Sequence, residues 1–350
     1  MALVNFLPWT VDGDHVVDVS IGPDGDLWFI WTKVSVATDL YVTITDKDLV
    51  VKDTYTLVGA ITSYTYTRMG IVVTRSNVAV IGYQYGSFAG GVGTYLRTLT
   101  KDGVFGTARL ASGDFYNAMQ LCLWNGCEDA LYAYPGPAEG QYTFVPFNTG
   151  SGTLGTPFSS VVNGSVTWKY LYHENQLRYD PWTDELHLIA DCSIYPYPSG
   201  LNTNPRSILH VWGTAGQRSE IITPAGQLPD GSTYRAMAPF IDFDKRENVK
   251  RLWLVWERVT SETVSCGSYG STGVREGYAV MVKDGDTWAG PYGIWNQKNC
   301  VDGVVWGMNI LVDGDGSVHL AGAGTERIIH RIGNVPTFTR EENANYLGDG

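Results

Sequence analysis

Side chains that could perform acid–base chemistry on a sugar are present in this chain, but no spacing groups them. A hydrolase acting on an acidic sugar needs arginines for the substrate carboxylate, a Tyr–Glu nucleophile pair and an aspartic acid that donates a proton. A lyase needs His, Tyr and Arg instead. Residues of these types are scattered along the chain at Tyr172, His173, Arg178, Asp191, Arg206, Arg235, Asp242, Glu257 and Arg275. The sequence therefore predicts no catalytic residues.

Metal and phosphate sites are not indicated either. The six histidines are isolated, and His187, His210 and His319 lie in alternating strand patterns, which favours packed or hydrogen-bonded roles. The segment 313–317 resembles a calcium loop but lacks the later glutamate, so a hairpin turn explains it better. There is no glycine-rich phosphate loop and no nucleophile elbow. We expect no metal and no cofactor.

Aromatic side chains in the expected loops are the stronger signal. Tyr and Trp among Ser, Gly and Asn form contact surfaces for proteins and stacking platforms for sugars. Packing of each ring beneath its own loop is the competing interpretation. The candidate residues for binding a ligand or partner are Tyr83, Tyr85, Phe88, Trp168, Tyr172, Tyr195, Tyr197, Tyr234, Arg235 and Tyr269.

The composition indicates which elements carry these rings. Of 350 residues, 44% are hydrophobic and 17% charged, with 12 Trp, 21 Tyr and 41 Gly. This excess of aromatic residues and glycine over helix formers favours strands and tight turns. No run of 18 apolar residues occurs, so we expect no membrane insertion. The net charge of −12, without a basic run, argues against a nucleic-acid partner.

Cysteines and the start of the chain bear on the compartment. Five Cys are present, and Cys122 and Cys127 flank a tight turn where they could face each other. Because residues 1–9 lack the features of an export signal, free thiols are the favoured interpretation. Such a chain stays in the cytosol, leaves by a route that needs no signal, or has been trimmed.

An internal repeat dominates the sequence. Each copy is an apolar strand, a turn rich in Asp, Gly or Asn, and a second apolar strand; the copies begin at 18, 69, 119, 176, 239 and 309. A weaker pair of strands follows each hairpin, as at 95–100 and 106–110. Asp-Gly at the corners, as in Lys101-Asp102-Gly103, tolerates the positive φ of a tight turn.

Four short antiparallel strands in units of about 50 residues are typical of propeller blades. We expect an all-β, six-bladed β-propeller of four-stranded antiparallel blades: one domain, 1–350, with an N-terminal arm or closing strand at 1–12. Blades should start near 15, 64, 114, 170, 234 and 304. A β-sandwich lacks the 50-residue period, and a β-helix repeats at shorter intervals.

Loop length predicts the binding face. The 1–2 and 3–4 turns are short, whereas the 2–3 connections at 82–94, 133–141, 191–206 and 257–276 are long. The connections between blades at 157–174 and 223–237 are long too. Because functional loops concentrate on one face of a rigid scaffold, the face with the long loops should bind.

The blade pattern resembles the sialidase-like and BNR-type propellers over most of the chain. The nearest match to their Asp-box is Lys283-Asp284-Gly285-Asp286-Thr287-Trp288, which is one residue short. The combination of propeller, low charge, abundant Tyr and Trp, and no export signal looks like a bacteriophage virion protein of the tail or receptor-binding class.

That resemblance implies a non-enzymatic virion structural protein, made in the host cytoplasm. It would scaffold through one face and bind a partner or a host-surface glycan through the other. Other virion proteins in an oligomeric assembly are the expected partners. The alternatives are a carbohydrate-active propeller (a sialidase-like hydrolase or a polysaccharide lyase) and a secreted lectin.

Overall fold

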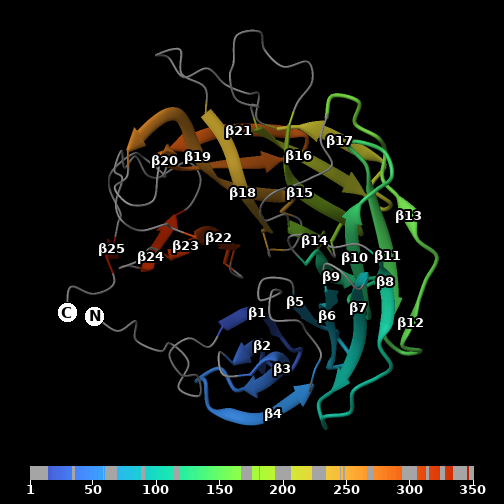
Figure 1. The fold of residues 1–350 in the computed structure, drawn as a ribbon. Helices are drawn as coiled ribbons and strands as arrows, with labels where there is room; N and C mark the ends of the chain where they lie inside the picture. Colours follow the sequence, from blue (N-terminus) through green and yellow to red (C-terminus); the bar gives the residue numbers. More distant parts are fainter. Residues whose placement is uncertain are drawn as a thin grey trace. The chain divides into compact units, whose positions relative to one another are not determined.

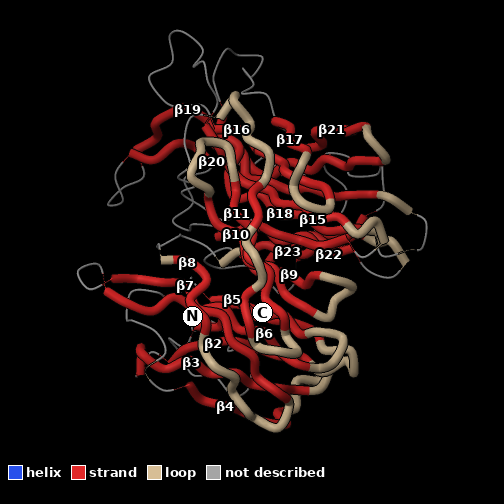
Figure 2. The backbone as a smooth tube through the Cα atoms, turned by 90° about the vertical axis from the view of Figure 1, so that its right-hand side faces the viewer, coloured by secondary structure: helices blue, strands red, loops and turns tan. Residues whose placement is uncertain are grey.

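The protein is all-β, and the residues that the structure describes contain no helix (Figure 2). No helix capable of spanning a membrane is found among them. The computed structural model describes residues 15–33, 36–57, 59, 69–87, 91–113, 119–166, 176–180, 182–193, 206–222, 234–244, 246, 249–265, 271–293, 306–312, 315–323, 328–333 and 345–346. Contacts group the chain into two compact units. Unit 1 comprises 1–136 and 142–160, and unit 2 comprises 137–141 and 161–350.

Unit 1 contains three antiparallel sheets in chain order, with strand order following the sequence in the first two. The first has β1 (His15–Ile21), β2 (Leu27–Lys33), β3 (Val36–Thr45) and β4 (Val51–Leu57). The second has β5 (Met69–Val73), β6 (Val78–Ser87), β7 (Gly91–Thr100) and β8 (Arg109–Ser112). The third has β9 (Leu121–Trp124), β10 (Asp129–Pro135) and β11 (Tyr142–Asn148), whose outer edge pairs with two short strands, β12 (Thr153–Leu154) and β13 (Phe158–Ser159).

Unit 2 repeats the four-stranded antiparallel pattern three times (Figure 1). The fourth sheet has β14 (Gln176–Asp180), β15 (Glu185–Ser193), β16 (Arg206–Gly213) and β17 (Arg218–Ile221). The fifth has β18 (Tyr234–Phe243), β19 (Arg251–Ser265), β20 (Ser271–Asp284) and β21 (Thr287–Gly293). The sixth has β22 (Trp306–Val312), β23 (Val318–Ala323), β24 (Ile328–Gly333) and β25 (Asn345–Tyr346).

The six hairpins expected from the repeat are confirmed as the first two strands of each sheet. Short turns have the predicted chemistry, since Gly25 and Gly316, in turns between first and second strands, have positive φ, as do Gly103 and Gly285, in turns between third and fourth strands. The expected arm at 1–12 lies outside the described residues.

Two of the four expected long 2–3 connections are strand instead, and that part of the prediction is wrong. In 82–94, β6 continues to Ser87 and β7 begins at Gly91. In 257–276, β19 continues to Ser265 and β20 begins at Ser271. The pairs β6–β7 and β19–β20 stay hydrogen-bonded through the residues expected to form loops. In β19 these residues include Val259 and Thr263, whose β-branched side chains favour strands. The connections are therefore short, and the extra residues lengthen hairpins.

The core lies between successive sheets and follows the two-residue period of the strands. In β6, Ala79 and Ile81 face the first sheet, where Trp28 and Ile30 are buried. Val80 points the other way, onto the cluster of the third sheet. Both faces of the second sheet are thus buried, which explains the nearly continuous apolar runs of its second strand.

Polar side chains link the first strands of neighbouring sheets at three points within the two units. The first strand of each of these sheets lies at the edge and pairs on one side alone, so alternate backbone N–H groups on its other side need an acceptor. Asp18 Oδ2 accepts from Ile71 N at 3.0 Å, and Gln176 Oε1 accepts from Ile241 N at 2.5 Å. Asp242 Oδ2 accepts from Val312 N at 2.7 Å. The sheets are therefore joined by hydrogen bonds as well as by apolar packing.

Candidate functional site

The predicted binding residues fall into three groups. Phe88, Trp168, Tyr172, Tyr195, Tyr197 and Tyr269 lie outside the described residues. Tyr234 and Arg235 belong to strand β18 rather than to a loop, because 234–237 pair with β19. Tyr83 and Tyr85 both lie in β6, and the structure separates their environments.

Tyr83 is corrected from a loop residue to a core residue. Its side chain is 5% exposed and belongs to the cluster between the first and second sheets. Burial raises the pKa of the Tyr83 phenol, and Arg97 opposes that shift without cancelling it. Tyr83 is therefore a neutral, packed ring, as the competing interpretation proposed for loop aromatics.

Tyr85 is the described candidate that is exposed. Its side chain is 50% exposed, and its ring meets the ring of Tyr95 edge-on at a centroid separation of 6.4 Å. Tyr95 in turn stacks on Tyr83 at 6.0 Å. The exposed ring is thus anchored through a second ring to a buried third one, which limits the conformational entropy it would lose on binding a ligand.

A glycine opposite Tyr85 lets Leu110 pack beside these rings. Tyr85 pairs with Gly93, and a Cβ on Gly93 would lie 2.3 Å from Leu110 Cδ1 and 3.3 Å from Tyr95 Cε2. Leu110 is 52% exposed. We call the surface formed by Tyr85, Tyr95 and Leu110 around Gly93 the Tyr85 platform.

Hydrogen bonds between buried side chains hold the strands that carry the platform. On the opposite face of β6 and β7, Gln84 Nε2 donates to Thr94 Oγ1 at 3.3 Å, and both side chains are buried. Tyr132 of the third sheet donates its hydroxyl to the same Thr94 oxygen at 3.2 Å. Arg97, two positions after Tyr95 in β7, donates to the carbonyl of Gly106 in the β7–β8 connection at 2.6 Å. The three side chains of the platform are uncharged, and hydrogen bonds hold the strands that carry them.

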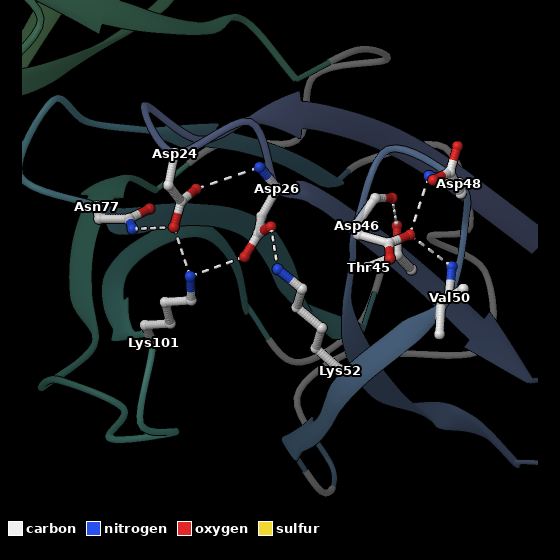
Figure 3. A network of polar contacts seen from close by, with 9 residues as sticks. All are labelled: Asp24, Asp26, Thr45, Asp46, Asp48, Val50, Lys52, Asn77 and Lys101. Atoms are coloured by element: carbon white, nitrogen blue, oxygen red, sulfur yellow. Dashed lines mark hydrogen bonds and ion pairs between the residues drawn. The ribbon is translucent and has the colours of Figure 1, made fainter.

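The turn end of unit 1 carries a polar network that joins the first two sheets (Figure 3). Lys101 bonds both Asp24 and Asp26, the second at 2.7 Å, and Lys52 also bonds Asp26. Asn77 donates to Asp24 at 2.6 Å. Burial opposes ionisation of Asp24, but the hydrogen bonds from Lys101 and Asn77 outweigh it and lower the Asp24 pKa to about 2.

The neighbouring Asp46 turn is internally satisfied. Its carboxylate accepts from the backbone N–H groups of Asp48 and Val50, each at 2.9 Å (Figure 3). The acidic groups at this end therefore pair with lysines and with backbone N–H groups, which is a structural role. Among the residues described, no group of three or more His, Cys, Asp or Glu could hold a metal ion.

The charged residues considered for catalysis are not brought together where the structure describes them. Asp242 accepts the Val312 N–H, as above, and Asp191 is buried in β15. Arg178 lies in β14 and donates to the carbonyl of Leu177. Cys122, Cys127 and Cys192 are reduced cysteines, as the sequence favoured for these three.

Sequence reasoning missed one exposed aromatic residue, Trp182, in the β14–β15 turn. Asp180 holds this turn by accepting from Trp182 N at 2.9 Å and from Thr183 Oγ1 at 2.7 Å. The Trp182 side chain remains 56% exposed. A tryptophan inside a short polar turn was the signal that could have identified this residue. The turn joins the first two strands of its sheet, and loop length predicts binding on the face with the long loops instead.

No protein-family model matches the chain, and no curated protein sequence matches it significantly. Three solved structures resemble its fold. A polysaccharide lyase described as PL25 ulvan lyase is 8% identical, with a TM-score of 0.55 over 91% of this chain and 81% of that one. AofleA from Arthrobotrys oligospora is 12% identical, with a TM-score of 0.53 over 95% and 87%.

The third is the β-propeller domain of the Trilobed protease from Pyrococcus furiosus, at 10% identity and a TM-score of 0.49 over 96% and 86%. At such identities the likeness concerns the fold alone. Successive antiparallel sheets in chain order, five of them four-stranded and the third with five strands, are the organisation of propeller blades, and the fold is of the β-propeller type.

Proposed function

We propose that the chain is a non-enzymatic binding propeller that engages a partner or a surface glycan through aromatic contacts. The observation that carries this proposal is the Tyr85 platform: an exposed ring that is anchored, uncharged and flanked by a second exposed apolar side chain. Such a surface suits the apolar face of a sugar ring or the side chains of a protein. In this proposal the six sheets are the blades of one six-bladed propeller spanning 1–350.

We further propose that this propeller is a bacteriophage virion structural protein with a tail or adhesion role. The support is compositional: low charge, many Tyr and Trp, and the resemblance to sialidase-like and BNR-type blades. Other virion proteins would contact one face, and a host-surface glycan would contact the other. The protein would be made in the host cytoplasm and assembled into the particle; secretion as a lectin is the alternative location.

Ligand binding by the platform is tested with Tyr85→Ala against an array of neutral and acidic oligosaccharides and intact host cells. Truncating a true anchor costs about 1–3 kcal/mol, so affinity should fall roughly 5- to 150-fold. Tyr85→Phe keeps the ring and should retain most of the affinity. Val104→Ala, an exposed residue of the same unit, is the matched control. Equal binding by Tyr85→Ala and the parent chain would remove the platform from the proposal.

The virion role needs a separate experiment. Antibody labelling of purified particles should place the protein on the tail, and dissociated particles should contain it in a fixed stoichiometry. Absence from particles would overturn the virion role while leaving the binding role untouched, because the two rest on different observations.

A second candidate function is a carbohydrate-active propeller, a sialidase-like hydrolase or a polysaccharide lyase. The likeness of the fold to that of the ulvan lyase supports this candidate. The decisive measurement is release of reducing or unsaturated sugar ends from a polysaccharide panel. Turnover that is lost in Arg235→Ala, while Tyr85→Ala chiefly raises KM, would favour the enzyme over the binding protein.

A further inference from the structure

A buried chain of ionisable side chains runs across the fourth sheet. His187 on β15, His210 on β16 and Glu220 on β17 project from three adjacent strands. His187 Nδ1 lies 3.0 Å from His210 Nε2, and His210 Nδ1 lies 2.9 Å from Glu220 Oε1. Both histidines are buried. We refer to His187 and His210 as the histidine pair.

The fifth sheet closes over this chain, so the pair lies at the contact between two sheets of unit 2. The ring of Phe243 on β18 meets His187 edge-on at 5.0 Å. Lys283 Nζ on β20 donates to Glu220 Oε1 at 2.9 Å, and Trp288 Nε1 on β21 donates to the same oxygen at 3.0 Å. Lys283 and Trp288 come from the Asp-box-like turn, which here connects two sheets.

The hydrogen-bonding roles in the chain follow from the charge of Glu220. Burial opposes ionisation of Glu220, but bonds from His210, Trp288 and Lys283 lower its pKa to about 2. A carboxylate can only accept, so His210 Nδ1 carries the hydrogen. Neutral His210 therefore accepts at Nε2, and His187 donates from Nδ1. At neutral pH two hydrogen bonds thus link the three side chains, with both rings uncharged.

An added proton has no favourable position. It charges either His187 at Nε2 or His210 at Nε2, and the second choice breaks the bond between the rings. Trp212, stacked on His210 at 4.5 Å, and Phe243 enclose the rings with apolar surface.

The charged groups that face the pair are Glu220 and Arg218 on β17 and Lys283 on β20, and Glu185 on β15 pairs with Arg218. Two cations thus oppose the new charge, and Glu220 already accepts three donors at one oxygen.

We propose that the histidine pair is a proton-sensitive latch that holds the fourth sheet against the fifth at neutral pH and releases it on acidification. Release would expose the surfaces between β15–β17 and β18–β21, giving the protein a second conformation at low pH. The latch is independent of the Tyr85 platform, which lies in unit 1.

The pKa directions agree with this geometry. Burial, reinforced by Lys283 and Arg218, lowers the pKa of His210 to about 4 although Glu220 opposes the shift. Burial and His210 lower the pKa of His187 well below its usual value. A histidine whose pKa is lowered in the closed state contributes stability that is lost as the pH falls below about 6.5. The window for release is therefore about pH 6.5 to 4.

Hydrogen exchange of the full chain at about pH 7 and about pH 5, corrected for intrinsic rates, tests the latch. With a pKa of about 4 when closed and 6.5 when open, opening at the latch should increase about 20-fold between these pH values. Peptides from β15, β16 and β20 should lose protection accordingly, while those from β2 and β3 should not. Unchanged protection in β15 and β16, or an equal loss in β2 and β3, would overturn the proposal.

Variants separate the pair from general acid effects. His187→Phe/His210→Gln keeps a ring against Phe243 and an N–H donor toward Glu220, and its exchange should no longer respond to pH. His319→Gln, a partly exposed histidine on β23, is the matched control and should respond like the parent chain.

Because the double variant could fail to fold, NMR titration of the parent chain provides a second test. His210 should titrate at about pH 4, and His187 should titrate well below the usual pKa of a histidine. Six histidines that all titrate above about pH 6 would refute the latch.

Discussion

Gln176 connects the fourth and fifth sheets through one hydrogen bond whose loss should be measurable. Its Oε1 accepts from the backbone N–H of Ile241, and both side chains are buried. Ile241 lies in β18, an edge strand of its sheet. Gln176→Met keeps the length and volume of the side chain but removes the acceptor, so the Ile241 N–H would be left buried without a partner.

The expected cost follows from that unsatisfied donor. Because Met preserves packing, the loss of apolar burial is small, and the desolvated N–H dominates at about 1–3 kcal/mol. This corresponds to roughly a 5- to 150-fold increase in the equilibrium constant for opening the contact between the two sheets.

Two measurements check this prediction. Urea unfolding followed by tryptophan fluorescence reports the change in stability, and native-state hydrogen exchange reports the Ile241 amide itself. Arg178→Met, on the same strand, removes a long polar side chain that donates to its own backbone segment. This control should change stability by less than about 0.5 kcal/mol. A Gln176→Met chain as stable as the parent, with the Ile241 amide still protected, would refute the reasoning.

Two further predictions concern unit 1. Gly103→Ala should destabilise unit 1 by about 1–3 kcal/mol, because φ is +87° and a Cβ would lie 2.4 Å from the Tyr55 ring. Urea unfolding measures the change, and Gly113→Ala, where a Cβ would meet open space, is the control and should be nearly neutral. Lys101→Met should lower stability at about pH 7, and its effect should shrink as the pH falls from about 3.8 towards 2, because Lys101 lowers the pKa of Asp24 to about 2 and also lowers that of Asp26, so both carboxyls contribute stability that is lost over that range. An acid dependence of the unfolding midpoint identical to that of the parent chain would contradict this assignment.

The repeat could be found in the sequence because its signals are local. A strand needs alternating or continuous apolar residues, and a hairpin turn needs residues that tolerate positive φ. Both are properties of a few neighbouring positions, and Gly25 and Gly103 have the backbone conformation that the turn pattern predicts. The order of strands within each sheet follows, since short turns force neighbouring strands to pair.

The candidate site was less predictable, because exposure depends on what lies across the strand. Tyr83 and Tyr85 are two residues apart and lie on the same face of β6, yet the first is buried and the second half-exposed. Tyr83 pairs with Tyr95 inside the contact with the first sheet, whereas Tyr85 pairs with Gly93. Their sequence context is nearly the same, so no pattern of residue types distinguished them.

For the histidine pair, too, the sequence determined the local structure and the tertiary structure determined the contacts. The sequence by itself determined that His187 and His210 belong to strands and have packed or hydrogen-bonded roles. Only the tertiary structure decided that they bond each other and that Glu220 ends the chain of hydrogen bonds. It also decided that Lys283, which is distant from both histidines in sequence, bonds Glu220 from the next sheet. Bonds between sheets depend on register across strands that are distant in sequence, and a single sequence carries no direct record of that register.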